Sequence, residues 1–256
     1  MNIFTFVFQE ALYRPLLNLL MVFYNLPYVD LGIAILITTA VIRLVLWPLH
    51  SKAIISQRDT QVKSQHMQEK IKEIKEKYKD DPTSQSAEMM NFFKKNKFNP
   101  FSGIMPMVVQ IIVLIAFYQA LRIILEPAGL DLLYGFVESP GSVSPMFFRT
   151  IDLSKAIPVL AILTGIAQYF HSKITFQAQA KKKKQKSKKE KAKQISKKQD
   201  GQMENMQKMM QKQMLYFMPM FTVFIGWVLP ATLILYWLFS TLIGIVQQKI
   251  IFNKER

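Results

Sequence analysis

The chain has 256 residues, of which 50% are hydrophobic, and Lys+Arg outnumber Asp+Glu by 33 to 17. The apolar residues lie in long blocks and the lysines in separate blocks, which is typical of an integral membrane protein. The absence of cysteine excludes disulfides, thiolate metal sites and a cysteine nucleophile. The net charge of +16 favours anionic partners such as lipid headgroups or nucleic acid.

Residues 1–29 predict an amphipathic helix lying in the membrane interface. Glu10, Arg14 and Asn18 are spaced four apart, which puts them on one face of a helix, while apolar residues cover most of the remainder. A true membrane span is the alternative interpretation of this pattern. The segment has neither a basic start nor a small-residue cleavage site, so we do not expect a cleavable signal peptide.

Apolar blocks long enough to cross a membrane follow. A hydrocarbon core of about 30 Å needs roughly 20 apolar residues as helix, and such blocks predict spans over about 31–50, 104–125 and 156–176. A longer block carries Pro230 near its middle and is divided into two spans, 212–229 and 231–248. The predicted fold is an all-α polytopic membrane protein whose five transmembrane helices form one domain over 30–248.

The positions of the basic residues predict the orientation. The segments 51–99 and 171–213 hold 11 and 14 Lys/Arg, whereas residues 1–30 hold one and 122–155 hold three. Because cytoplasmic segments collect Lys and Arg, the N-terminus is expected outside and the short basic tail, 249–256, in the cytoplasm.

A cytoplasmic helical hairpin is predicted over 52–97. Met67, Ile71, Ile74 and Tyr78 are spaced 4, 3 and 4 apart, which lays one apolar stripe along a helix. Asp81-Pro82 ends that helix. The hairpin is interpreted either as a docking surface or as a solvated arm without a partner.

A second cytoplasmic segment, the basic loop 177–211, contains a lysine run. Residues 181–198 hold 11 lysines and one glutamate, a composition that cannot bury a core and predicts disorder. The run is interpreted as a contact for RNA phosphates or anionic lipid, or as an orientation signal only. The candidate contact residues are Lys181, Lys182, Lys183, Lys184, Lys188 and Lys189.

Arg43 is the most unusual residue in the predicted spans. It lies 13 residues into the first span, about 18 Å deep in a straight helix, and no predicted span contains Asp or Glu. An arginine at such a depth costs at least about 2.5–3.5 kcal/mol. Snorkelling toward the cytoplasmic side is one interpretation. A hydrated, positively charged recess is the other, and it is favoured by further polar or amphipathic side chains in the spans: Thr39, Gln110, Gln168, Tyr236 and Trp237.

The predicted spans offer no set of groups for catalysis. They contain no acid/base pair, no nucleophile beside a base, no metal cluster and no glycine-rich phosphate loop. We therefore expect a protein that is not an enzyme and needs neither a cofactor nor a metal.

Four stretches together resemble a known family of membrane proteins. They read IRLVLWPLHSKAIISQ (42–57), EKYKDDP (76–82), NPFSGIMPMVVQIIVLIAFYQAL (99–121) and LPATLILYWLFSTLIGIVQQ (229–248). Their order and spacing resemble the YidC/Oxa/Alb membrane protein insertases from about residue 4 to 248. The resemblance implies a location in the bacterial plasma membrane and a short form without the large outer domain of Gram-negative members.

The resemblance also implies a site. It is a hydrophilic groove, open to the cytoplasm and the lipid but closed to the outside, with Arg43 at its centre. Gln110, Gln168 and Trp237 are expected on its wall. The groove would let polar segments of nascent membrane proteins cross part of the bilayer without nucleotide hydrolysis.

Three functions are therefore weighed. The first is an insertase and chaperone for nascent membrane proteins, working alone or beside the Sec translocon, with a monomer favoured. Its lysine run would bind ribosomal RNA phosphates in place of the basic C-terminal tail of other family members. The second is a small secondary transporter or anion pore, which the absence of carboxylates in the spans disfavours. The third is a membrane tether for RNA or ribosomes.

Overall fold

The computed structural model describes residues 9–99, 105–124, 131–190 and 215–254, and these are mostly helical. In chain order the elements are the π-helix η1 (Gln9–Tyr13), α2 (Arg14–Tyr24), α3 (Leu31–Val45), α4 (Trp47–His66), α5 (Gln68–Lys77), α6 (Pro82–Lys95), α7 (Met105–Ile124), β1 (Met146–Phe147), β2 (Ile151–Asp152), α8 (Pro158–Glu190), the helix Leu215–Gly226 and α10 (Ala231–Lys254). The two short strands pair antiparallel.

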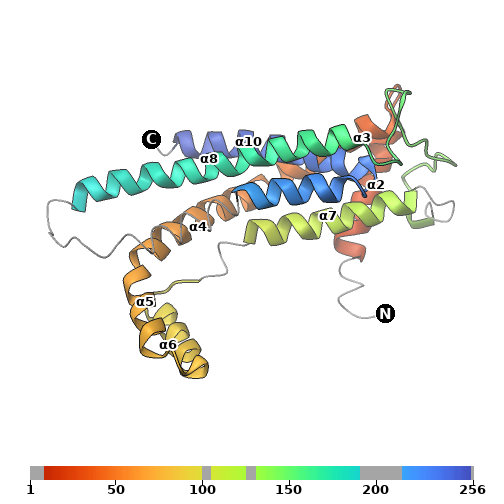
Figure 1. Ribbon diagram of the computed structural model, residues 1–256. Coiled ribbons are helices and arrows are strands. Elements are labelled where there is room, and N and C mark those ends of the chain that lie inside the picture. Colours follow the sequence, from red (N-terminus) through yellow and green to blue (C-terminus); the bar gives the residue numbers. More distant parts are fainter. Residues whose placement is uncertain (1–8, 100–104, 125–130, 191–214, 255–256) are drawn as a thin grey trace.

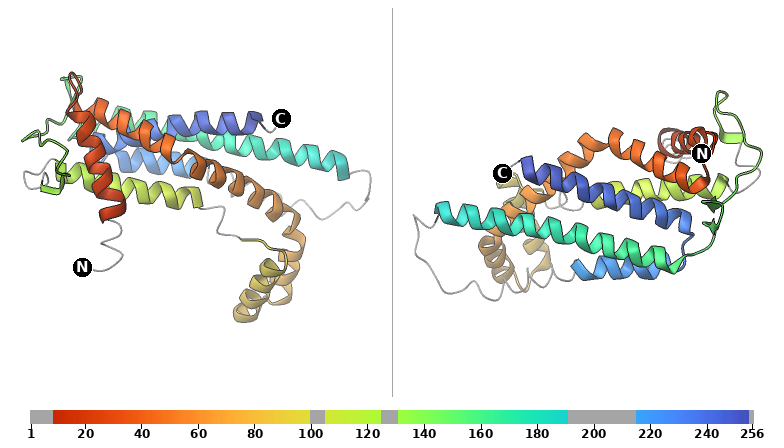
Figure 2. Two further views of the ribbon diagram at one scale, coloured as in Figure 1. Left: turned by 180° about the vertical axis from the view of Figure 1, so that it is seen from behind. Right: turned by 90° about the horizontal axis from the view of Figure 1, so that it is seen from above.

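The long helices form one bundle. α3, α7, α8, α10 and the helix Leu215–Gly226 run along one another (Figures 1 and 2). α2 lies across one end of this bundle, where β1 and β2 are also found, and the pair α5–α6 projects from the opposite end. The described loops and short elements are thus sorted to two ends of the bundle.

The first predicted span differs from the structure, because the helix does not continue to residue 50. α3 ends at Val45, Leu46 leaves helical geometry with φ −84° and ψ 5°, and α4 then starts at a bend of 65°. The physical cause is Pro48, which has no N–H to donate to a preceding carbonyl and disfavours helix at the residue before it. Arg43 therefore lies in the last turn of α3, close to a break.

The lysine run also differs from its prediction. Residues 181–190 are the C-terminal part of α8, whereas disorder was predicted for 181–198. Lysine, glutamine, alanine and glutamate are good helix formers, and extending an existing helix avoids the cost of nucleation. Residues 191–198 lie outside the described part of the chain.

Within the described residues, one helix is long and apolar enough to cross a membrane by itself, over Ala231–Asn253 of α10. The bent pair Leu31–Val45 and Trp47–Gln57 passes the same test when taken together. Shorter apolar helices are Val108–Ile124 and Leu215–Gly226. The count of five spans stays a prediction.

The polar face of α2 contacts the loop before β1. Asn18 is buried, its amide donates to the Leu132 carbonyl at 3.3 Å, and its Oδ1 accepts from the Tyr134 backbone N–H at 2.6 Å. Arg14 Nε donates to the same Leu132 carbonyl at 3.1 Å. The opposite face of α2 packs into the core with Leu17 and other apolar residues. Both faces are thus used inside the protein.

The same end of the bundle is closed by contacts around Asp30. Its side chain caps α3 by accepting from the Ile33 N–H at 2.9 Å and also accepts from the Phe148 N–H at 2.5 Å. A Cβ on Gly32 would lie 2.1 Å from the Phe147 ring, so only glycine permits this approach. The strand pair therefore sits directly against the start of α3.

Candidate functional site

Arg43 reaches from α3 to two neighbouring helices. Its Nε donates to the Ser240 hydroxyl of α10 at 2.8 Å, and its Nη2 donates to Gln110 Oε1 of α7 at 2.8 Å. A second contact to the Ser240 hydroxyl also comes from Nη2. The guanidinium thus joins three helices that are far apart in the sequence.

The fourth contact of Arg43 is with His50, on the far side of the helix break. Arg43 Nη1 lies 3.4 Å from His50 Nδ1. A guanidinium can only donate hydrogen bonds, so Nδ1 must accept, which leaves the ring proton on Nε2. That Nε2 is buried and has no hydrogen-bond partner in the described part of the chain.

The hydrogen-bond partners of Arg43 in the described part of the chain are neutral. Within the described residues, the ion pairs join other side chains and no carboxylate pairs with Arg43. The spans therefore hold a cation whose charge is solvated by two amide or hydroxyl oxygens and an imidazole nitrogen. Such a cation keeps most of its attraction for an anion.

Tyr236 fixes the Gln110 side chain from the other direction. Gln110 Nε2 donates to the Tyr236 hydroxyl at 3.1 Å, which turns Oε1 toward Arg43. The Tyr236 ring stacks on Phe117 of α7, with centroids 4.3 Å apart. Thr39, one turn before Arg43, is buried and donates its hydroxyl back to the Ile35 carbonyl at 2.6 Å. A packed core therefore supports the cluster.

The space between these side chains is small. A cavity of about 10 Å³ is lined by Thr39, Ile42, Arg43, Leu46, His50, Gln110, Val113, Tyr236 and Ser240. This is about the room that one water molecule requires. In this conformation the side chains themselves fill the recess, so a polypeptide could enter only after the helices that carry them separate.

Four of the predicted groove residues meet in this recess, and two do not. Thr39, Arg43, Gln110 and Tyr236 all line it. Gln168 of α8 instead accepts a hydrogen bond from the Thr222 hydroxyl at 2.6 Å, and so joins α8 to the helix Leu215–Gly226. The ring of Trp237 packs against the apolar core.

Ser240 and His50 are members of the recess that the sequence analysis did not select. Ser240 follows Tyr236 by four residues on α10, a spacing that puts both on one helix face and could have identified it. His50 follows Arg43 by seven residues, on the far side of the bend at Leu46, which was not predicted from the sequence. Its ring lies 3.4 Å from the Arg43 guanidinium.

The six candidate lysines of the basic run belong to the helical part of α8 that ends at Glu190. Their side chains lie outside the described part of the structure.

The outer surface of the bundle is strongly apolar. Large exposed side chains of the helix Leu215–Gly226 and the turn after it include Phe217, Met220, Phe224 and Val228, of which Met220 and Phe224 are 74% and 73% exposed. Soluble proteins rarely expose contiguous apolar surface of this kind. The surface is suited to contact with lipid.

Comparison with known proteins identifies the family of the chain. The family described as 60Kd inner membrane protein matches residues 22–256. The chain is similar to membrane protein insertases YidC of Treponema denticola (29% identity, covering 97% of this chain and 38% of the relative), Chlamydia muridarum (28%, covering 95% and 28%) and Wigglesworthia glossinidia brevipalpis (30%, covering 94% and 36%). It thus spans less than two fifths of the length of these relatives. The helical bundle, the apolar surface and the match over residues 22–256 lead to one conclusion: the chain belongs to the 60Kd inner membrane protein family of bacterial membrane proteins.

Proposed function

We propose that this chain is a membrane protein insertase. The single observation that carries the proposal is Arg43, a cation between α3, α7 and α10 that is bound by neutral groups only. An enzyme of ordinary type would need reacting groups beside it, and a structural arginine inside a membrane would be expected to have a carboxylate partner. A cation whose neutral partners can be replaced is better suited to bind a negatively charged polypeptide segment for a short time.

Arg43 should interact more strongly with a carboxylate than with one of its neutral partners. A hydrogen bond from a charged donor such as this guanidinium to a neutral acceptor contributes about 1.5–3 kcal/mol net. A carboxylate 4 Å from the guanidinium is attracted by about 4 kcal/mol at an effective dielectric constant of 20. An acidic residue of a nascent chain could therefore displace either Ser240 or Gln110 as a partner of Arg43. Burial of the following apolar helix in lipid would then drive release, so no nucleotide is required.

We further propose that the recess opens toward the cytoplasm and the lipid but not toward the outside. The support is the closure at the Asp30 end, where the strand pair and α2 are hydrogen bonded to the bundle. The break at Leu46, at the other end, supplies a place where α3 and α4 can separate. The expected polar segment would thus enter near His50 and stop short of Asp30.

The proposed topology places the N-terminus outside and the C-terminus in the cytoplasm. The lysine-rich segments 51–99 and 171–190 come from the end of the bundle opposite to α2 (Figure 1). This arrangement agrees with the preference of cytoplasmic segments for Lys and Arg.

Nascent membrane proteins are the proposed substrates, and ribosomes or anionic lipids the proposed partners of the lysine run. α8 continues 14 residues beyond residue 176, and at about 1.5 Å per residue lysines 181–189 would lie about 8 to 20 Å beyond that residue on the cytoplasmic side. Ribosome co-sedimentation in neutral detergent tests this contact. Removal of 181–198 should abolish binding if ribosomal RNA is the partner, and unchanged binding contradicts it. Association with the Sec translocon and a monomeric state are proposed on the resemblance alone.

The experiment for the insertase is insertion of two substrates into proteoliposomes, one with an acidic translocated segment and one with the matching amides. Arg43→Ala should lose at least about tenfold in insertion rate on the acidic substrate, and Arg43→Lys should retain a substantial part of it, because charge matters more than geometry for a mobile carboxylate. Arg122→Ala, an exposed arginine at the end of α7, is the matched control. Equal rates for wild type and Arg43→Ala on the acidic substrate would contradict the proposal.

A further inference from the structure

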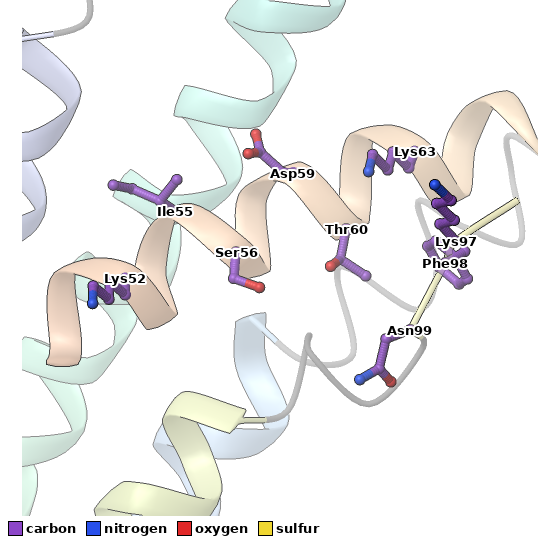
Figure 3. A pocket seen from close by; sticks show the side chains of 9 residues that line it. All are labelled: Lys52, Ile55, Ser56, Asp59, Thr60, Lys63, Lys97, Phe98 and Asn99. Carbon is purple, nitrogen blue, oxygen red and sulfur yellow. The ribbon is translucent and has the colours of Figure 1, made fainter. Parts of the chain in front are cut away.

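A second and larger cavity lies away from Arg43, at the end of the bundle from which α5 and α6 project. It has a volume of about 540 Å³ and lies between α4 and residues 97–99, the segment that leads from α6 toward α7 (Figure 3). Cavities of this size are typical of small-molecule sites. The insertase proposal makes no use of it.

The charge of the cavity wall is positive. Lys52 and Lys63 come from α4 and Lys97 from the segment after α6, and the carboxylate among the lining residues is that of Asp59. In the part of the chain that is described, none of these three lysines forms an ion pair. Three ammonium groups from two separate segments thus border one cavity together with one carboxylate, so the lining residues carry a net positive charge.

Short polar side chains lie between these lysines. Ser56 and Thr60 are four residues apart on α4 and project from the same side of the helix, with Asn99 across from them (Figure 3). Hydroxyl and amide groups are the usual neutral donors to phosphate oxygens, and lysines supply the charge. The wall therefore combines the two kinds of group that recognise a phosphate ester.

The position of the cavity relative to the membrane identifies the source of the phosphate. Lys52 follows Trp47 by five residues, and Asn99 precedes the start of α7 by six, so both are close to the ends of apolar helices. The chain bends by 65° between α3 and α4. If α3 follows the membrane normal, the eleven residues from Lys52 to Lys63 rise about 7 Å, within the headgroup layer.

The remaining wall is apolar. Ile55 of α4 and Phe98 line the cavity beside the lysines. This combination suits a headgroup that is attached to a glycerol and acyl chains, and lysines that border a membrane extend their ammonium groups toward such headgroups. A polynucleotide is expected instead to follow an extended basic surface.

We propose that this cavity binds the phosphate headgroup of an anionic lipid of the cytoplasmic leaflet. The site is distinct from the Arg43 recess and from the lysine run of α8. Because its ligand would link α4 to the segment after α6, occupancy would fix the base of the α5–α6 pair relative to the membrane. The inference goes beyond the insertase proposal, and it can fail while that proposal stands.

The test measures binding of short-chain phosphatidylglycerol to the full chain in neutral detergent, by native mass spectrometry. Three variants keep the lysine run of α8 intact. One is Lys52→Gln/Lys63→Gln/Lys97→Gln, which removes the charge of the cavity. The second, Ser56→Trp, fills the cavity at an exposed position without changing charge. The third is the control Lys75→Gln/Lys77→Gln/Lys79→Gln, which removes the same charge elsewhere.

We expect both cavity variants to weaken binding at least about tenfold and the control to change it less than about twofold. The binding of phosphatidylcholine should be the same for the wild type and for every variant. An equal loss of phosphatidylglycerol binding in the two triple variants would contradict the proposal, because the loss would then follow from the net charge of the protein alone. Unchanged phosphatidylglycerol binding in Ser56→Trp would also contradict it. Inorganic phosphate that competes as well as the lipid would assign the site to free phosphate. A short RNA that depends more strongly on the cavity lysines would assign it to nucleic acid.

Discussion

The side-chain amide of Gln247 on α10 donates a hydrogen bond to the backbone carbonyl of Trp47, 3.0 Å away, at the first residue of α4. The same Nε2 lies 3.0 Å from the Ser51 hydroxyl, one turn further along α4. Gln247 is fully buried. α10 therefore holds the chain on the far side of the break at Leu46, only two turns after it supplies Ser240 to Arg43.

Replacing the Gln247 amide should weaken the contact between α10 and the start of α4. Gln247→Leu removes both hydrogen bonds within a buried site, and we expect it to lower the free energy of unfolding by about 1–2 kcal/mol. The measurement is thermal unfolding in detergent. Val246→Leu, at the neighbouring exposed position, is the control and should leave the unfolding temperature unchanged. An unchanged temperature for Gln247→Leu as well would show that the bond does not stabilise the bend.

Tyr236 contributes to the recess in two ways that substitution can separate. Tyr236→Phe loses the hydrogen bond from Gln110 but keeps the ring stacked on Phe117, and should cost about 0.5–1.5 kcal/mol. Tyr236→Ala also loses the ring and leaves a cavity, so about 3–5 kcal/mol is expected. Both values come from unfolding in detergent. If the two variants were equally stable, the ring stack would have no part in supporting Gln110.

The sequence was sufficient to predict the helical class and to single out Arg43 as an unusual residue of a span, because both depend on local features. Long apolar blocks predict helices wherever they occur, and a lone arginine in such a block is visible without a structure. Pro230 likewise marked the boundary before α10, which starts at Ala231. These features need no knowledge of which helices are neighbours.

The membership of the recess could not be predicted in the same way. Ser240 enters it because α10 packs against α3, and His50 lies on the far side of the bend at Leu46. Gln168 was chosen as a polar residue in a span, but the neighbour of its helix face is Thr222. Helix packing thus decides which of several similar polar residues meet Arg43.

Asp30 should connect the start of α3 to the strand pair. Asp30→Ala removes the acceptor for both the Ile33 and the Phe148 amides, and we expect a loss of about 1 kcal/mol and faster hydrogen exchange at both amides. Asp131→Ala, an exposed carboxylate in the loop before β1, is the control. Unchanged exchange at Phe148 in Asp30→Ala would contradict the closure of this end.

The stability of the first turn of α6 should depend on pH. Hydrogen bonds from Ser84 and then from Thr83 hold the pKa of Asp81 below its ordinary value, and this carboxylate caps the helix. A lowered pKa means that the capping contribution is complete above the ordinary pKa of about 3.8 and is lost as the pH falls through the lower, folded value. The protection of the Thr83 and Ser84 amides, measured as the exchange rate relative to an unprotected amide at the same pH, should therefore fall below about pH 4. The same pH dependence in Asp81→Asn would assign the effect to another group.

The most direct test of the insertase account uses the absence of cysteine in the chain. Val113→Cys places one thiol in the Arg43 recess while leaving Arg43 in place, and Val159→Cys places one on the exposed face of α8. A ribosome-stalled membrane protein with a single cysteine in its acidic segment is then oxidised in the presence of each variant. The account predicts a disulfide to position 113 that forms several times faster than one to position 159, and that is lost when Arg43→Ala is added. Equal crosslinking at both positions, or crosslinking at 113 that is indifferent to Arg43, would contradict it.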